Sequence, residues 1–324
     1  MTIGCERPSF PRRRESSDWY PDLLRSYIFE TFNHRLEENI INQKSRPDAK
    51  GPVISFHPMI KGDLFYWERG IQDKDMIRNL TKARAIILPQ TVSGELYALC
   101  RTLCANVFPN YSLRFKWEGK VGDTLLFWSC GIPHPKTWIF PRVETMIGDH
   151  PEMGHRPRLP DYPFVIKGTS GGEGSQIWLI RNAQDLKHAT EILKHFEIQG
   201  LFGFVLQEFI PNLQRDLRVV IIGNHIQSYW RCNTSGFLHN IAKGGQIDAR
   251  SDPELQAIGR DAVKKLCTHT GINMAGFDLV FLEGSNIPLF IEINYTFGRT
   301  GLGGSDAFYE FLENEVNQWL EMCS

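Results

Sequence analysis

The sequence lacks the features that mark several large classes of protein. Its 37 acidic and 36 basic residues nearly balance, so no overall charge draws it toward nucleic acid or an anionic membrane. No apolar run reaches the roughly 18 residues that a membrane-spanning helix needs. Arg12, Arg13 and Arg14 have no apolar stretch behind them, so we expect no signal peptide. These absences predict that the protein binds neither nucleic acid nor membrane.

Cysteine and histidine are present, but they are not grouped as metal ligands or nucleophiles. The 7 cysteines include no Cys-x-x-Cys pair. Cys100 and Cys104, four apart on a predicted helix, fit core packing better than metal binding. The 10 histidines are dispersed, and none joins a Ser/His/Asp or Cys/His set. An odd number of scattered thiols is typical of a reducing compartment, so we predict a cytoplasmic protein.

Several segments have clear secondary-structure signals. Strand and helix patterns alternate over residues 51–118, which predicts a small parallel α/β domain. Residues 142–161 are rich in Pro and His and predict an irregular crossing. Long helices are predicted over 253–270 and 306–322. The start of the chain, rich in Pro, Arg and Ser, predicts a disordered tail.

Near the C-terminus, two alternating apolar runs flank the turn-forming residues 283–286 and predict a β-hairpin. If the turn centres near Ser285, Asp278 lies directly across from Glu292, and Asn294 points to the same face. Two carboxylates and an amide oxygen suit magnesium, and buried carboxylates would repel each other without a cation. The alternative is a solvated hairpin face. A one-residue slip in register would separate the two carboxylates.

Three glycine-rich loops could bind anions. In the first, Lys167 ends a predicted strand and precedes Gly171, Gly172 and Gly174, whose backbone amides could wrap phosphate. The order of residues matches neither a Walker A loop nor a dinucleotide fingerprint. The second loop covers 240–245. For each loop an ordinary turn is the alternative.

The third loop contains Arg299 and leads into the last predicted helix, whose N-terminal amides could hold an anion. A separate strand ends in Gln207 and Glu208. Such a strand end can present backbone groups to an adenine and a carboxylate to a ribose. Taken alone, Glu208 also fits a solvated strand edge.

The order of these motifs resembles the ATP-grasp superfamily, and within it the RimK-type glutamate ligases and the glutathione synthetases. The resemblance covers about residues 120–314. It implies an ATP-grasp fold, in which a small α/β domain precedes two α+β lobes that clasp ATP. The expected division is an N-terminal tail and helical extension over 1–50, the α/β domain over 51–118, a central lobe over 119–200 and a C-terminal lobe over 201–324.

The resemblance also implies a role for each matching residue. The residues that would bind phosphate are Lys120, Lys167, Gly171, Gly172 and Gly174. The adenine hinge would be formed by Gln207, Glu208, Phe209 and Ile210. The ribose would be bound by Glu208 or Asp216. One or two magnesium ions, with manganese as an alternative, are assigned to Asp278, Glu292 and Asn294. The phosphate and acceptor region is assigned to Arg218, Arg231, Asn240 and Arg299.

Two positions depart from the family pattern. Leu238 stands where many relatives have an arginine, whose charge Arg231 or Arg299 would then supply, and Phe297 replaces a usual proline. The activity implied is ATP-dependent carboxylate–amine ligation through an acyl phosphate, releasing ADP. It would join an amino acid to a peptide, protein or small acid, in a homo-oligomer as in many relatives. The alternatives are an ATP-grasp phosphotransferase and a non-catalytic nucleotide-binding module.

Overall fold

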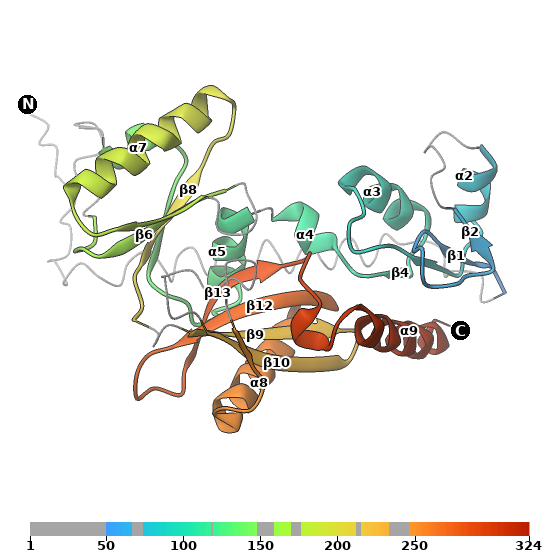
Figure 1. Ribbon diagram of the computed structural model, residues 1–324. Helices are drawn as coiled ribbons and strands as arrows, with labels where there is room; N and C mark the ends of the chain where they lie inside the picture. Colours follow the sequence, from blue (N-terminus) through green and yellow to red (C-terminus); the bar gives the residue numbers. More distant parts are fainter. Residues whose placement is uncertain are drawn as a thin grey trace, which may run out of the picture.

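The computed structural model describes residues 50–66, 74–117, 119–147, 159–169, 176–211, 215–232 and 246–323 (Figure 1). Within these ranges the chain forms three sheets. The predicted N-terminal helices, Gly171, Gly172, Gly174 and Asn240 lie outside the described residues. No helix in the described part is both long and apolar enough to cross a bilayer.

The first sheet is parallel and belongs to the α/β domain. Its strands have the order β2-β1-β3-β4, and β1 and β3 are buried along their whole length, as is usual for parallel strands covered on both faces. Ser93 caps α3, because its side chain accepts a hydrogen bond from the amide of Leu96. Cys100 and Cys104 are buried, as expected. The elements are β1 (Val53–Ser55), β2 (Leu64–Phe65), α2 (Lys74–Leu80), β3 (Ala85–Ile87), α3 (Gly94–Leu103), β4 (Val107–Phe108) and α4 (Ser112–Lys116).

The second sheet is antiparallel, with the order β5-β8-β6-β7. Apolar side chains such as Phe164 and Ile166 face α6 and α7, so the alternate residue Lys167 points to the opposite face. Since β8 pairs with β5 and β6, this sheet extends past the boundary expected at residue 200. Its elements, with the preceding helix, are α5 (Gly119–Ser129), β5 (Thr137–Phe140), α6 (Val143–Ile147), β6 (Phe164–Gly168), β7 (Ile177–Ile180), α7 (Ala183–Ile198) and β8 (Phe204–Glu208).

The third sheet is antiparallel, with the order β11-β10-β9-β12-β13. Leu217 and Val219 pack with α8 on one face, so the alternate residue Arg218 points to the other face. The elements are β9 (Arg215–Ile222), β10 (His225–Cys232), β11 (Gln246–Asp248), α8 (Pro253–Thr270), β12 (Met274–Phe281), β13 (Pro288–Asn294), the 3-10 turn η3 (Thr300–Leu302) and α9 (Ser305–Met322).

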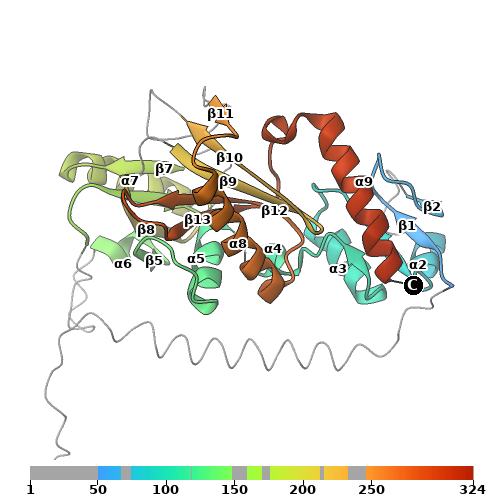
Figure 2. The same cartoon turned by 90° about the horizontal axis from the view of Figure 1, so that it is seen from below.

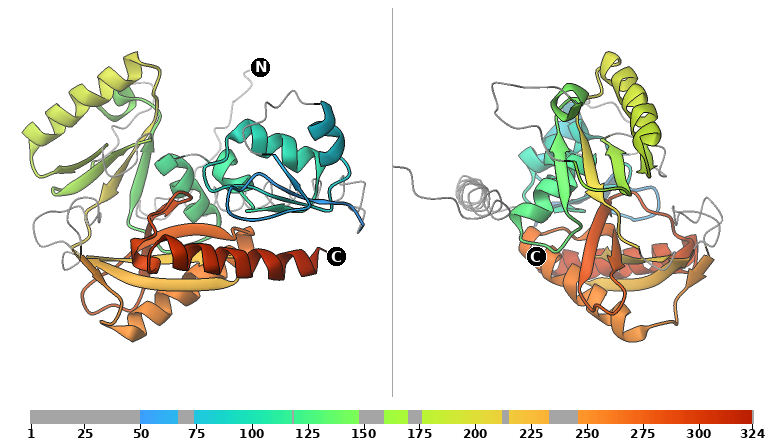
Figure 3. Two further views of the ribbon diagram at one scale, coloured as in Figure 1. Left: turned by 45° about the vertical axis from the view of Figure 1, so that its right-hand side comes forward. Right: turned by 90° about the vertical axis from the view of Figure 1, so that its left-hand side faces the viewer.

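Two helices join these parts. α5 contacts both β8 and β13, so it lies between the two antiparallel sheets (Figure 1). α9 runs along the N-terminal domain (Figures 2 and 3). There Trp319 packs on Phe108 with ring centroids 5.5 Å apart. α5 therefore connects the two antiparallel sheets, and α9 packs against the α/β domain.

The expected architecture, an α/β domain followed by two α+β lobes, is confirmed, and the long helices lie where they were predicted. The prediction of an irregular crossing over 142–161 was wrong at its start, where α6 forms with Val143 and Met146 buried. β2, β4, β5 and β11 were also not predicted. β2 and β4 have only two residues each, too few for a period-2 pattern to be recognised.

Candidate ATP and magnesium site

The β12–β13 hairpin has the register predicted from its sequence. Asp278 pairs directly with Glu292, and Asn294 follows two residues later opposite Gly276. The register then shifts, because Leu279 pairs with Phe290. This bulge lies beside Glu292, and bulges commonly re-aim a neighbouring side chain. The three proposed metal ligands therefore share one face of the sheet, the face opposite α8.

Asp278 is held by two arginines from the neighbouring strands. Arg218, directly opposite it on β9, places Nε 2.5 Å from Oδ1 and donates from Nη2 to Oδ2 at 3.2 Å. Arg231 Nη2 lies 2.9 Å from Oδ2, and Asn294 Nδ2 donates to the same oxygen at 3.1 Å. Burial alone would raise the pKa of Asp278, but the two guanidinium groups outweigh it and lower that pKa. Asp278 is therefore ionised.

Arg231 also makes a bidentate pair with Asp216, through Nε to Oδ1 at 2.7 Å and Nη2 to Oδ2 at 2.8 Å. Burial would lower the pKa of Arg231, whereas Asp278 and Asp216 raise it, and the net change is upward. Arg231 thus bridges two carboxylates. The resemblance placed Asp216 near a ribose, and in the structure its carboxylate is engaged with Arg231. Gly276 leaves room for this cluster, since a Cβ there would lie 2.8 Å from Arg218 Nη1.

Two buried lysines approach the cluster from the other side. Lys120, on α5, places Nζ 3.7 Å from Glu292 Oε1. Lys167, on β6, donates to Gln207 Oε1 at 2.7 Å, and Gln207 in turn donates to Thr137. Burial lowers the pKa of Lys167 to about 8, and the charge of Glu292 opposes that shift. Both predicted phosphate-binding lysines therefore lie near the carboxylates of the hairpin, although they come from different segments.

Asp123 is a buried carboxylate that the sequence analysis missed. It lies on α5, three residues after Lys120, and its Oδ2 accepts a hydrogen bond from the backbone amide of Ile293 at 3.1 Å. Burial, and then the charge of Glu292, raise its pKa well above the ordinary value. Both causes favour the protonated, uncharged form of Asp123. An i, i+3 spacing between a lysine and an acid on a helix was the only signal in the sequence, and it is common on solvated helices.

The side chains on the hairpin fit magnesium. They offer only oxygen ligands, which this ion prefers. Asp278 Oδ1 is buried and receives no well-directed hydrogen bond, despite its contact with Arg218 Nε, so it keeps the capacity to bind a cation. Within the described residues, no group of three or more His, Cys, Asp or Glu side chains is arranged as a metal site. Binding would therefore rest on two carboxylates and the amide of Asn294.

The remaining predicted residues lie on other segments of the chain. Glu208 is exposed at the end of β8 and is followed by the half-buried Phe209 and Ile210. Arg299 lies five residues after Asn294, and its guanidinium carbon stacks 4.4 Å from the Phe308 ring centroid. The structure brings Lys120, Lys167, Arg218, Arg231, Asp278, Glu292 and Asn294 into one buried or half-buried group.

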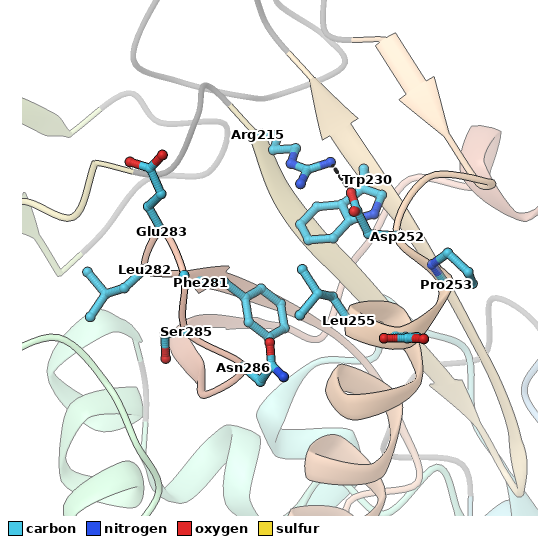
Figure 4. Close-up of a pocket in the computed structure, with 12 residues that line it drawn as sticks. Arg215, Trp230, Asp252, Pro253, Leu255, Phe281, Leu282, Glu283, Ser285 and Asn286 are labelled. Carbon is cyan, nitrogen blue, oxygen red and sulfur yellow. Dashed lines mark hydrogen bonds and ion pairs between the residues drawn. The ribbon is translucent and has the colours of Figure 1, made fainter.

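A separate cavity of about 490 Å³ lies at the tip of the hairpin and the start of α8 (Figure 4). Its wall includes Trp230, over which Arg215 stacks at 4.2 Å while pairing with Asp252 at 2.6 Å. Trp230 is adjacent to Arg231 on β10, so the two side chains point to opposite faces of the sheet. This cavity therefore lies on the α8 side, away from the cluster around Asp278.

A comparison with protein families matches residues 139–307 to the RimK-like ATP-grasp domain. Among curated proteins, the alpha-aminoadipate–LysW ligase LysX of Sulfurisphaera tokodaii is 23% identical over 298 residues, which are 89% of this chain and 96% of the relative. Human N-acetylaspartylglutamate synthase A is 25% identical over 154 residues, 47% of this chain and 37% of its own length.

Among solved structures, D-cycloserine synthetase DcsG superposes with a TM-score of 0.54 at 15% identity, covering 79% of this chain and 90% of its own. A RimK domain ATP-grasp protein from Sphaerobacter thermophilus superposes with a TM-score of 0.51 at 15% identity, and the match covers 81% of this chain and 98% of the other. These two likenesses support the fold. The family match spans more than half of the chain and includes the hairpin, β6 and β8. The chain belongs to the RimK-like ATP-grasp family.

Proposed function

We propose that this protein is an ATP-dependent carboxylate–amine ligase that forms an amide bond and releases ADP and phosphate. The observation that carries the proposal is the buried meeting of Lys120 with Glu292 and of Arg218 and Arg231 with Asp278, in a chain of this family. Buried charges are costly unless they serve a partner. An ATP polyphosphate with magnesium would be such a partner.

Each group has a proposed task. Lys120 and Lys167 hold phosphate oxygens, because both ammonium groups lie near the hairpin face and neither is fully neutralised by a short ion pair in the described part of the chain. Asp278, Glu292 and Asn294 would hold magnesium, which when bound supplies positive charge against the phosphates. Glu208 to Ile210 provide the adenine hinge at the end of β8.

The proposed reaction has two balanced steps. A substrate carboxylate attacks the γ-phosphorus of ATP, so that an acyl phosphate forms and ADP leaves with the bridging oxygen. An amine then attacks the acyl carbon, phosphate departs, and the amine loses a proton. The contribution of this chain is orientation and electrostatic stabilisation by Lys120, Lys167, Arg218 and Arg231. A protein nucleophile is not needed.

The relatives guide the substrate class. Their names refer to alpha-aminoadipate and to N-acetylaspartylglutamate, which contain acidic amino acids. We therefore propose an acidic amino acid as one substrate, with a peptide, protein or small acid as the other. Activity in a homo-oligomer is part of the same proposal and follows only from the resemblance.

The test is ADP release from ATP and magnesium in the presence of mixed amino acids and small carboxylic acids. We expect ADP only when a carboxylate and an amine are both supplied. Glu292→Gln should lower that rate by at least about 100-fold, since several kcal/mol of charge stabilisation depend on the metal. Glu283→Gln is the matched control, because Glu283 is exposed at the tip of the same hairpin. ADP release that needs no amine would contradict ligation.

A further inference from the structure

His57 presents an unused hydrogen-bond donor at the end of β1. Its Nδ1 accepts the backbone amides of Met59 and Ile60, at 3.1 and 3.2 Å. A neutral imidazole carries one proton, so this network assigns the proton to Nε2. Nε2 has no hydrogen-bond partner among the described residues, although the side chain is only 5% exposed. This nitrogen is not one of the unpaired polar atoms that solvent cannot reach, so its proton is open to a ligand.

Arg299 presents a positive charge that no carboxylate neutralises within the described ranges. Its Nη1 donates to the hydroxyl of Tyr309 at 2.9 Å, and its guanidinium carbon stacks 4.6 Å from the centre of the same ring. Arginine has five N–H donors in a planar fork, so this arrangement leaves several of them available. The aromatic contacts hold the guanidinium plane in one orientation.

Tyr309 brings these two groups together. The His57 ring meets it edge-on with centroids 5.9 Å apart, while Arg299 lies against it as described. The pKa of His57 is lowered to about 4, by burial and then by the charge of Arg299. The imidazole therefore stays neutral and keeps its Nε2 proton at pH 7. The 18-residue helix α9 begins at Ser305 with no side chain capping its N-terminus, which adds a partial positive charge.

We propose that His57 and Arg299 form a subsite for the carboxylate of an acidic substrate that does not react. The subsite joins the N-terminal domain to the loop after Glu292 and Asn294, and it rests on the ligase function proposed above. A reacting carboxylate must reach the γ-phosphate near Lys120. The pair of His57 and Arg299 offers only donors and positive charge, so it would bind a second, spectator carboxylate.

The experiment compares two probes that differ in one group. Glutarate has two carboxylates, whereas glutaramate replaces one of them by a neutral amide of the same shape. Calorimetric titration of protein saturated with ADP and magnesium gives a dissociation constant for each. We expect glutarate to bind about 10- to 100-fold more tightly, as charge-assisted hydrogen bonds predict. Equal binding of the two probes, or binding of neither, overturns the proposal.

Matched variants locate the effect. Arg299→Met keeps an aliphatic stem over the rings but removes the charge, and His57→Asn keeps an acceptor where Nδ1 stands but removes the distal donor. Both variants should bind glutarate and glutaramate with similar dissociation constants. His57→Gln restores a distal N–H and should recover part of the difference. Arg114→Met is the control, since Arg114 stacks on Tyr111 at 4.8 Å elsewhere in the fold. An unchanged preference in Arg299→Met contradicts the subsite.

Two further measurements separate the possible causes of failure. ADP affinity should be unchanged in the His57 variants and in Arg114→Met. If a substitution at one of the two residues lowered ADP affinity, the substitution at the other residue would be used instead. The comparison of glutarate with glutaramate on the native chain would then decide whether the subsite exists. Inorganic phosphate is a third probe, and its displacement of glutarate at lower concentration would show a phosphate site instead. If the native chain releases ADP only with both substrates, yet the probes bind alike, the subsite fails and the ligase proposal stands.

Discussion

The hydrogen bond from the Ile293 amide to Asp123 can be used to test what positions Glu292 relative to Lys120. β13 is an edge strand of its sheet, so the Ile293 amide, which points away from β12, needs a partner outside the sheet. Asp123 supplies it from α5, the helix that also carries Lys120. This bond therefore fixes the strand of Glu292 against the lysine that lies 3.7 Å from its carboxylate.

The magnitude follows from what each substitution removes. Asp123→Ala leaves the buried amide of Ile293 without an acceptor, which costs about 1–3 kcal/mol of stability. Loss of a partner that orients metal ligands typically lowers metal affinity about 10–100-fold. Asp123→Asn keeps an oxygen in the same place. Because the amide keeps the acceptor oxygen and the shape of the carboxyl group, and burial already disfavours the charged form of Asp123, we expect affinity within about threefold of the native value.

The assay is titration of Mn²⁺, as a paramagnetic substitute for Mg²⁺, into protein with ADP, followed by electron paramagnetic resonance, with urea unfolding in parallel. Asp261→Ala, at an exposed acid on α8, is the control and should change neither quantity. If Asp123→Asn weakened Mn²⁺ binding as much as Asp123→Ala, the charge of Asp123 would matter and the reasoning would be refuted. Native affinity in Asp123→Ala would refute it equally.

Three further predictions concern pH and packing. ATP affinity should fall as pH rises through about 8, because Lys167 then loses its proton, and Lys167→Arg should flatten this dependence in equilibrium titrations. The pKa of His57 is lowered to about 4 in the folded protein, so the stability that its neutral form contributes is lost as pH falls below 6.5. Urea unfolding should therefore show a loss of about 2 kcal/mol at pH 5. The His57→Asn variant should not show this loss. Gly276→Ala should cost about 1–3 kcal/mol by crowding Arg218, measured by the same method, and native stability there would contradict the packing.

The hairpin shows what sequence could predict. Period-2 alternation and a four-residue turn were enough to place Asp278 opposite Glu292, because a strand register has few alternatives when one face is buried. The site around it was only partly predictable. Arg218 meets Asp278 from 60 residues away, and Asp123 meets a backbone amide 170 residues away. Contacts of that kind depend on how sheets and helices dock, which no local pattern encodes.

The resemblance predicted the order of the motifs, but it did not predict which of their charged side chains pair with one another. The expectation was that a cation must separate two buried carboxylates, and the structure places protein cations there. It also gives Asp216 an arginine partner where a ribose had been expected. The boundary predicted at residue 200 separates β8 from the sheet to which it belongs. It was placed too early because a strand can pair with a strand that is distant in sequence.

The balance of charge in the cluster bears directly on what it can bind. With Asp123 left aside, four of its side chains are formally cationic and three are formally anionic. The cations are Lys120, Lys167, Arg218 and Arg231, and the anions are Asp216, Asp278 and Glu292. The formal charges of the cluster therefore nearly balance. We propose that a polyanion with divalent cations would pair with the lysines, and that carboxylate oxygens now held by arginine would then be available to the metal. On this proposal Arg218 and Arg231 would become available to an anionic substrate, so nucleotide binding and substrate binding would depend on the same side chains.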